Sequence, residues 1–84
     1  MKRDEIEKTI LEIMEREFDI KDPDRDVNLA EAYEFDSIDA LEMLSQVEQE
    51  FGALTMDEKK QLFEYRTINL ICDYLAAVFT SRAA

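Results

Sequence analysis

The chain has 84 residues, of which 21 are acidic, 10 are basic and none is histidine, so its formal net charge is -11. This length supports one modest hydrophobic core, and we expect a single domain over residues 1–84. The charge disfavours binding to nucleic acid and to anionic membranes, and it favours basic protein partners. Hydrophobic residues make up 46% of the sequence, which is too many for a disordered acidic tail.

The only cysteine, Cys72, has no partner for an internal disulfide, which fits a reducing compartment. The first residues, MKRDEIEK, lack the apolar core of a signal peptide. No stretch approaches the roughly 18 apolar residues that indicate a membrane span. We therefore expect a cytoplasmic protein that does not span a membrane.

The first predicted helix begins near Asp4, which would cap it with Glu7 as the reciprocal partner. Its apolar residues recur at helical spacing on one side, as expected for a core face: Ile6, Ile10, Ile13, Met14 and Phe18. Residues 19–26, which include Pro23, end this helix and open a loop that continues to about Phe35. Three apolar side chains are expected to hold the loop against the core: Val27, Leu29 and Tyr33.

A second helix is predicted from Ser37 to about Phe51, with Asp36 as its cap and Gly52 as its stop. Its core side is predicted to contain five apolar residues, with Leu41 at the edge: Ala40, Met43, Leu44, Val47 and Phe51. Ile38 falls on the polar side instead. An apolar side chain ringed by acids suits a transient contact with another protein.

Two further helices complete the predicted fold, and no segment has the pattern of a strand. Thr55 and Glu58 form a capping-box pattern ahead of a short helix from Met56 to Tyr65. Thr67 is expected to cap a largely buried last helix over residues 68–79. The predicted fold class is all-α, a four-helix bundle with three main helices and one short helix.

Acidic residues are concentrated in the middle of the chain. Residues 26–58 contain ten acids and no Lys or Arg. A solvated face that aids solubility and a docking surface for a basic partner both explain this pattern, and charge alone favours the first.

Ser37 lies at the predicted start of the second helix, where a serine most often serves local hydrogen bonding. A phosphodiester on Ser37 would also be well placed, because free backbone N–H groups and the helix dipole favour an anion there. Asp36 and Asp39 oppose this by repulsion. Phosphorylation by an acid-directed kinase is a third interpretation of the same site.

The segment from Glu34 to Leu44, EFDSIDALEML, resembles the attachment motif of acyl carrier proteins. Residues 47–52 are similar to the family's usual end of this helix, and residues 65–75 are similar to its last helix. The resemblance covers nearly the whole chain in the right order and spacing. It implies an acyl-carrier-like four-helix bundle that is not itself an enzyme.

The resemblance also implies a cofactor and partners. A phosphopantetheinyl transferase would move 4'-phosphopantetheine from coenzyme A to the Ser37 hydroxyl, with Asp36 helping to present the serine. The thiol would then hold an acyl or aminoacyl group as a thioester. The other partners would be loading and condensing enzymes with basic docking patches, for example in fatty acid or polyketide biosynthesis, and we expect a monomer. Four positions match those that partners usually touch: Ile38, Leu41, Glu42 and Ser45. The outer side of the second helix adds Asp39, Glu48 and Gln49 to the residues that we expect to bind partners.

The chain departs from the family pattern at several positions. Glu34 stands where the family commonly has Gly, Phe35 where a smaller residue or Leu is usual, and Ile38 where Leu is usual. Residues 53–66 lack a frequent Ile-Pro pair and are about two residues longer than usual. These departures favour a specialised stand-alone carrier over the housekeeping fatty-acid carrier.

The sequence offers three other functions. Alternating Asp22, Asp24, Asp26 and Asn28 suggest a calcium loop, but Val27 and Tyr33 occupy the positions where an EF-hand needs Gly and Glu. We therefore expect no dedicated metal site, and loose binding of a divalent ion among the acids is left open. Catalysis is disfavoured because there is no histidine and Cys72 lies on an apolar helix. The strongest alternative is an unmodified carrier-fold adaptor that binds a basic protein through the same acidic face.

Overall fold

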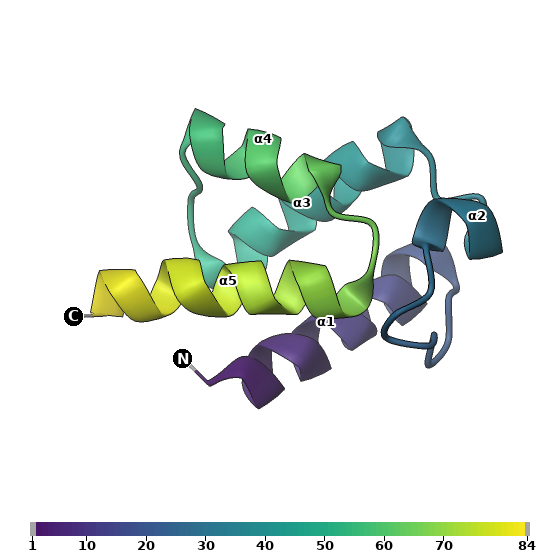
Figure 1. Ribbon diagram of the computed structural model, residues 1–84, viewed down its shortest axis with the longest axis horizontal. Helices are drawn as coiled ribbons and strands as arrows, with labels where there is room; N and C mark the ends of the chain where they lie inside the picture. Colours follow the sequence, from purple (N-terminus) through teal and green to yellow (C-terminus); the bar gives the residue numbers. More distant parts are fainter. Residues whose placement is uncertain (1, 84) are drawn as a thin grey trace.

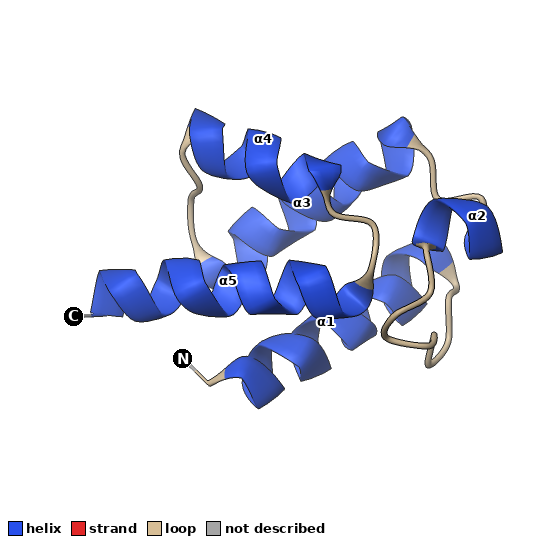
Figure 2. Cartoon of the chain, viewed as in Figure 1, coloured by secondary structure: helices blue, strands red, loops and turns tan. Residues whose placement is uncertain are grey.

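The computed structural model describes residues 2–83, and this part of the chain contains five helices and no strand (Figures 1 and 2). The helices are α1 (Arg3–Phe18), α2 (Leu29–Tyr33), α3 (Ser37–Phe51), α4 (Met56–Glu64) and α5 (Ile68–Ala83). α1 packs against α5 and α3, and α4 packs against α3. The predicted all-α fold is confirmed.

Most of the predicted helix boundaries are correct. α3 and α4 begin at the predicted residues, and Thr55 and Glu58 form the predicted capping box. Thr67 caps α5 through a hydrogen bond from the backbone N–H of Leu70 to its Oγ1 (3.1 Å). α3 stops at Gly52, whose φ of 125° suits a residue without a Cβ. α5 is longer than predicted, because it continues past residue 79.

Two predictions about the first third of the chain are wrong. The N-cap of α1 is Lys2, whose side chain makes no capping bond, and Asp4 lies inside the first turn. The predicted loop also contains a short helix, α2, whose cap Asn28 accepts a hydrogen bond from the backbone N–H of Glu31 (3.1 Å). Asn28 followed by Glu31 is a capping pattern, so the sequence did contain the signal for α2.

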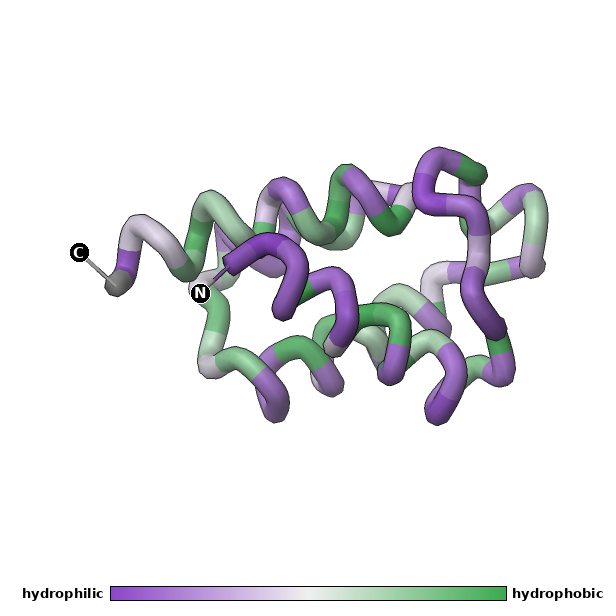
Figure 3. Tube along the Cα trace, turned by 90° about the horizontal axis from the view of Figure 1, so that it is seen from below, coloured by the Kyte–Doolittle hydropathy of each residue, from purple (hydrophilic) through white to green (hydrophobic). Residues whose placement is uncertain are grey.

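The core is formed by one side of each long helix. Figure 3 shows hydrophobic residues recurring at intervals along the otherwise hydrophilic α1, and four of them are fully buried: Ile6, Ile10, Ile13 and Met14. Leu29 is also fully buried, as predicted, but Tyr33 is 41% exposed. Phe35 takes the place predicted for Tyr33. It is only 3% exposed, and its ring meets that of Phe18 edge-on with centroids 5.1 Å apart.

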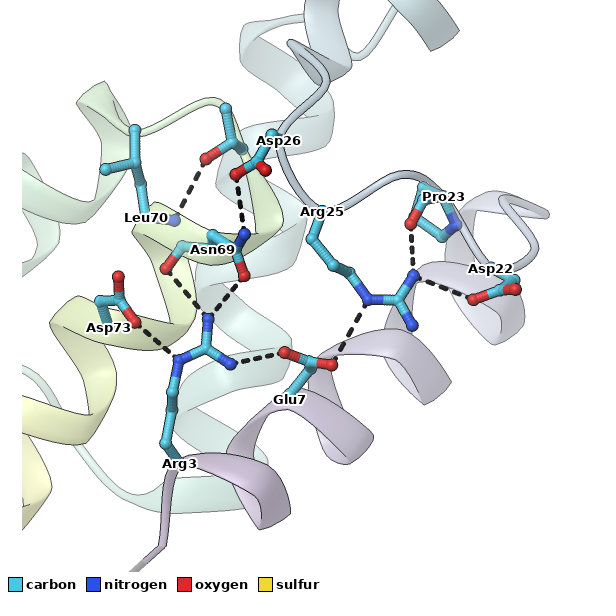
Figure 4. A network of polar contacts seen from close by, with 10 residues as sticks. Arg3, Glu7, Asp22, Pro23, Arg25, Asp26, Asn69, Leu70 and Asp73 are labelled. Atoms are coloured by element: carbon cyan, nitrogen blue, oxygen red, sulfur yellow. Dashed lines mark hydrogen bonds and ion pairs between the residues drawn. The ribbon is translucent and has the colours of Figure 1, made fainter.

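A polar network centred on Arg3 joins the start of α1 to α5 (Figure 4). The Arg3 guanidinium donates to Asp73 Oδ1 (2.6 Å), to Asn69 Oδ1 (2.7 Å) and to Glu7 Oε1 (2.5 Å). Arg25 extends the network by pairing with the other oxygen of Glu7 (3.4 Å). The network therefore holds the loop between α1 and α2 against both terminal helices.

Two acidic side chains of this loop contact other residues of the chain. Asp22 pairs with Arg25 (2.9 Å), and Asp26 Oδ1 accepts from the Asn69 amide (2.7 Å). Backbone bonds add to these contacts, because the N–H of Asn69 donates to the Arg25 carbonyl (3.0 Å). Within residues 2–83, no group of three or more Asp, Glu, His or Cys side chains is arranged to hold a metal ion.

The network predicts how stability depends on pH. Arg3 first, and Arg25 with it, holds the pKa of the Glu7 carboxyl below its usual value of 4.5, despite the opposing effect of burial. A carboxyl whose pKa is lower in the folded than in the unfolded chain stabilises the fold at pH values above its unfolded pKa. This stabilisation is lost as the pH falls. We expect Glu7→Gln to be less stable than the wild type at neutral pH, with the difference shrinking as the pH falls below about 4.5.

Thermal melting curves over a series of pH values measure this effect. Glu12→Gln is the control, because Glu12 is exposed and makes no ion pair with any described residue. Its melting temperature should stay close to that of the wild type throughout the series. A Glu7→Gln deficit that is the same at neutral and acidic pH would contradict the ionic role of Glu7.

Candidate functional site

The site begins with the first turn of α3, which is fixed by a reciprocal pair of hydrogen bonds. Asp36 Oδ1 accepts from the backbone N–H of Asp39 (2.9 Å), and Asp39 Oδ2 accepts from the backbone N–H of Asp36 (3.3 Å). The sequence predicted the cap at Asp36 but assigned Asp39 to partner binding and missed its capping role. The two bonds satisfy N–H groups that a helix start leaves free.

Ser37 is the first residue of α3, and its side chain is exposed. Asp36 performs the capping, and no residue between 2 and 83 hydrogen-bonds to the Ser37 hydroxyl. The local hydrogen-bonding role that is commonest for a serine at such a position is therefore not seen. An exposed, uncommitted hydroxyl at a helix start fits the covalent attachment of a phosphodiester.

Five residues that were predicted to bind partners are exposed along α3. Ile38 is 75% exposed and Leu41 is 58% exposed, although both are apolar. Glu42, Ser45 and Gln49 are also exposed. The structure therefore brings together apolar and acidic side chains in the turns that follow Ser37.

Glu48 differs from these exposed residues because it holds the connection between α3 and α4. Its Oε2 accepts from the backbone N–H of Leu54 (3.0 Å), and its Oε1 pairs with the Lys59 ammonium (3.2 Å). These two contacts, in that order, lower the pKa of the Glu48 carboxyl.

A hollow of about 450 Å³ lies between α3 and α4, and no pattern in the sequence predicted it. Its lining is mostly apolar and consists of Leu41, Leu44, Met56, Asp57, Lys59, Lys60 and Phe63. Ser37, Leu41 and Leu44 are spaced i, i+4 and i+7 along α3, so they share one face of the helix. Ser37 does not line the hollow, but it lies on the same face of α3, one turn before Leu41.

Glu34, which precedes this site, has a left-handed backbone with φ 56° and ψ 33°. Its N–H closes α2 by donating to the Leu29 carbonyl, but its exposed side chain makes no hydrogen bond or ion pair with any described residue. Asp19 and Asp22 are the other described non-glycine residues with positive φ, and Asp tolerates this region better than Glu. Glycine, which the sequence resemblance places at this position in the family, adopts this conformation without the Cβ penalty.

Cys72 is fully buried on α5. Burial raises the pKa of its thiol to about 12, so the sulfur stays protonated at neutral pH. Cys72 therefore acts as a core side chain.

Among residues 2–83, no helix combines the length and the apolar character that crossing a membrane requires.

The fold and the site define a small helical domain with an exposed serine at the start of a long helix. The family model described as "Phosphopantetheine attachment site" matches residues 8–75, so the chain belongs to this family, in agreement with the resemblance to acyl carrier proteins. Domains of the family carry covalent 4'-phosphopantetheine and work with a phosphopantetheinyl transferase and biosynthetic enzymes. They are typically non-catalytic. Searches of curated proteins and of solved structures returned no match.

The left-handed backbone at Glu34 predicts a stabilising substitution. A residue with a Cβ costs roughly 1–2 kcal/mol in this region, and the greater freedom of glycine in the unfolded chain offsets part of that cost. We expect Glu34→Gly to raise the free energy of unfolding by about 0.5–1 kcal/mol in urea titrations.

Gln49→Gly is the matched control, since Gln49 is exposed inside α3 and glycine there should cost about 0.5–1 kcal/mol. A decrease in the free energy of unfolding of similar size in both variants would show that the Glu34 backbone is not strained.

Proposed function

We propose that Ser37 is the residue of this chain that takes the 4'-phosphopantetheine arm, and that the chain carries acyl or aminoacyl groups between biosynthetic enzymes. The observation that carries the proposal is the exposed Ser37 hydroxyl, which Asp36 frees from capping. In the attachment reaction this hydroxyl loses its proton and forms a phosphodiester bond, while the pyrophosphate bond of coenzyme A breaks and releases adenosine 3',5'-bisphosphate. The bound arm supplies a terminal thiol that holds cargo as a thioester.

The main role of the residues around Ser37 is to position its hydroxyl. They do little to stabilise the negative charge of a phosphodiester. The start of α3 offers the positive end of a helix dipole to a phosphodiester. Asp36 and Asp39 are negative and lie in the same turn, so they offset much of that attraction. Asp36 contributes by beginning the helix at Ser37, which sets the direction in which the hydroxyl points.

The hollow beside α3 gives the cargo a place to rest. It lies on the same side of the helix as Ser37, and Leu41, Leu44 and Phe63 give it apolar walls. Burying apolar surface there stabilises by roughly 25 cal/mol per Å². An alkyl cargo would therefore lie between α3 and α4 when no partner enzyme is engaged.

Partner enzymes are proposed to dock on the exposed residues of α3 and on the half-buried Asp39 beside them. Ile38 would enter an apolar recess of the partner, while Asp39 and Glu42 would face basic residues around it. Long-range attraction speeds the encounter, and the apolar contact sets the lifetime of the complex. A carrier must be released after each step, so the affinity should be on the order of micromolar, or about 8 kcal/mol.

Attachment is tested by intact mass after incubation with coenzyme A and a broad-range transferase. The wild type should gain roughly a third of a kilodalton, the mass of the phosphopantetheine group. Ser37→Ala should fold and gain nothing, and Ser45→Ala, an exposed serine two turns along α3, should gain the same mass as the wild type. An unmodified wild type would instead favour the adaptor function, and a modified Ser37→Ala would place the arm on another residue.

Docking is tested by stopped-flow binding to the transferase. Glu42→Lys should slow association, whereas Ile38→Ala should mainly speed dissociation and leave the melting temperature unchanged, because Ile38 faces solvent. Glu12→Lys on α1 makes the same charge reversal away from α3 and should have a smaller effect than Glu42→Lys. Equal reductions of the association rate in Glu42→Lys and Glu12→Lys would show that only the total charge matters.

A further inference from the structure

Two lysines of α4 occupy an unexpected place. Met56, Lys59, Lys60 and Phe63 are spaced i, i+3, i+4 and i+7, and all four line the hollow. This spacing normally forms an apolar stripe, but here its two central positions are lysines. A lysine can lay its methylene stem along an apolar wall and keep its ammonium at the edge in water.

The charge of these lysines contrasts with that of their surroundings. They are the only basic residues between Arg25 and Arg66. The lining also includes one acid, Asp57. The two ammonium groups differ in their contacts, because Lys59 pairs with Glu48 (3.2 Å). No described residue within ion-pair or hydrogen-bond distance engages the Lys60 ammonium.

We propose that the cargo of this carrier is an acyl chain that ends in a carboxylate, and that Lys60 is the residue that selects it. This inference rests on the proposed function of Ser37. The methylenes of the chain would contact Leu41, Leu44 and Phe63, and the distal carboxylate would pair with the Lys60 ammonium at the edge of the hollow. The exposed part of α3 carries acids and no base, so a distal carboxylate directed there would be repelled.

The test compares two cargoes that differ only at their far end. Wild-type protein and Lys60→Gln are loaded by a broad-range transferase from hexanoyl-coenzyme A or from adipoyl-coenzyme A, which ends in a carboxylate. Intact mass confirms the loading. Hydrogen–deuterium exchange of the α4 amides then reports how strongly each cargo holds α4 against α3. Lys21→Gln is the control, since it removes the same charge from an exposed lysine far from the hollow in sequence.

In the wild type, adipoyl loading should slow exchange in α4 by about two- to five-fold relative to Lys60→Gln carrying the same cargo, which is the size of one exposed ion pair. Hexanoyl loading should give equal rates in both proteins, and Lys21→Gln should behave as the wild type does with either cargo.

Equal rates for adipoyl-loaded wild type and Lys60→Gln would overturn the inference and leave a carrier of plain alkyl chains. If Lys21→Gln lost the adipoyl-dependent slowing of exchange to the same extent, the overall charge and not Lys60 would be its cause, and the inference would be overturned. Failure of the wild type to gain the arm would overturn both this inference and the proposed function.

Discussion

The first turn of α3 is the constraint on which the rest of the site depends. Phe35 is buried against Phe18 immediately before the turn, and the reciprocal bonds between Asp36 and Asp39 begin the helix at a defined residue. These contacts fix the rotation of α3 as well as its start. A shift of one residue in the start would turn the following side chains by about 100° and move Ser37 away from the hollow.

A second set of contacts holds α4 in place and so maintains the hollow. Arg82, near the end of α5, donates to the Ala53 carbonyl (2.5 Å) and pairs with Glu58, which also caps α4 through the backbone N–H of Thr55 (2.8 Å). Glu48 adds its contact to Leu54 in the same connection. The far end of α5 thus stabilises the beginning of the wall that carries Lys60. The hollow is a product of the whole chain, although its lining comes from α3 and α4 alone.

Local rules predicted much of the fold from the sequence. Capping residues at Asp36, Thr55 and Thr67 gave correct helix starts, because a cap acts within one turn. The same rule failed at Asp4, where the helix already begins at Arg3 and Arg3 draws Glu7 into the network with α5. That network depends on tertiary contacts that no local pattern contains.

The sequence predicted only those parts of the candidate site that depend on local patterns. The exposure of Ile38 followed from helical periodicity, and the position of Ser37 followed from its neighbours. Whether Tyr33 or Phe35 would enter the core depended on the end of α2, where the left-handed backbone of Glu34 turns the chain between them. The hollow and the place of Lys60 could not be predicted, because they depend on how α4 lies against α3. That arrangement is set by packing between helices that are separate in the sequence.

We expect an arm on Ser37 to leave α3 on the side that borders the hollow. Isotope-filtered nuclear Overhauser spectra of the phosphopantetheine-bearing protein test this direction, because they identify the side chains nearest to the arm. We expect contacts from arm protons to Leu41, Leu44 and Phe63. Contacts only to Gln46 and Glu50, on the opposite side of α3, would show that the arm leaves the helix away from the hollow.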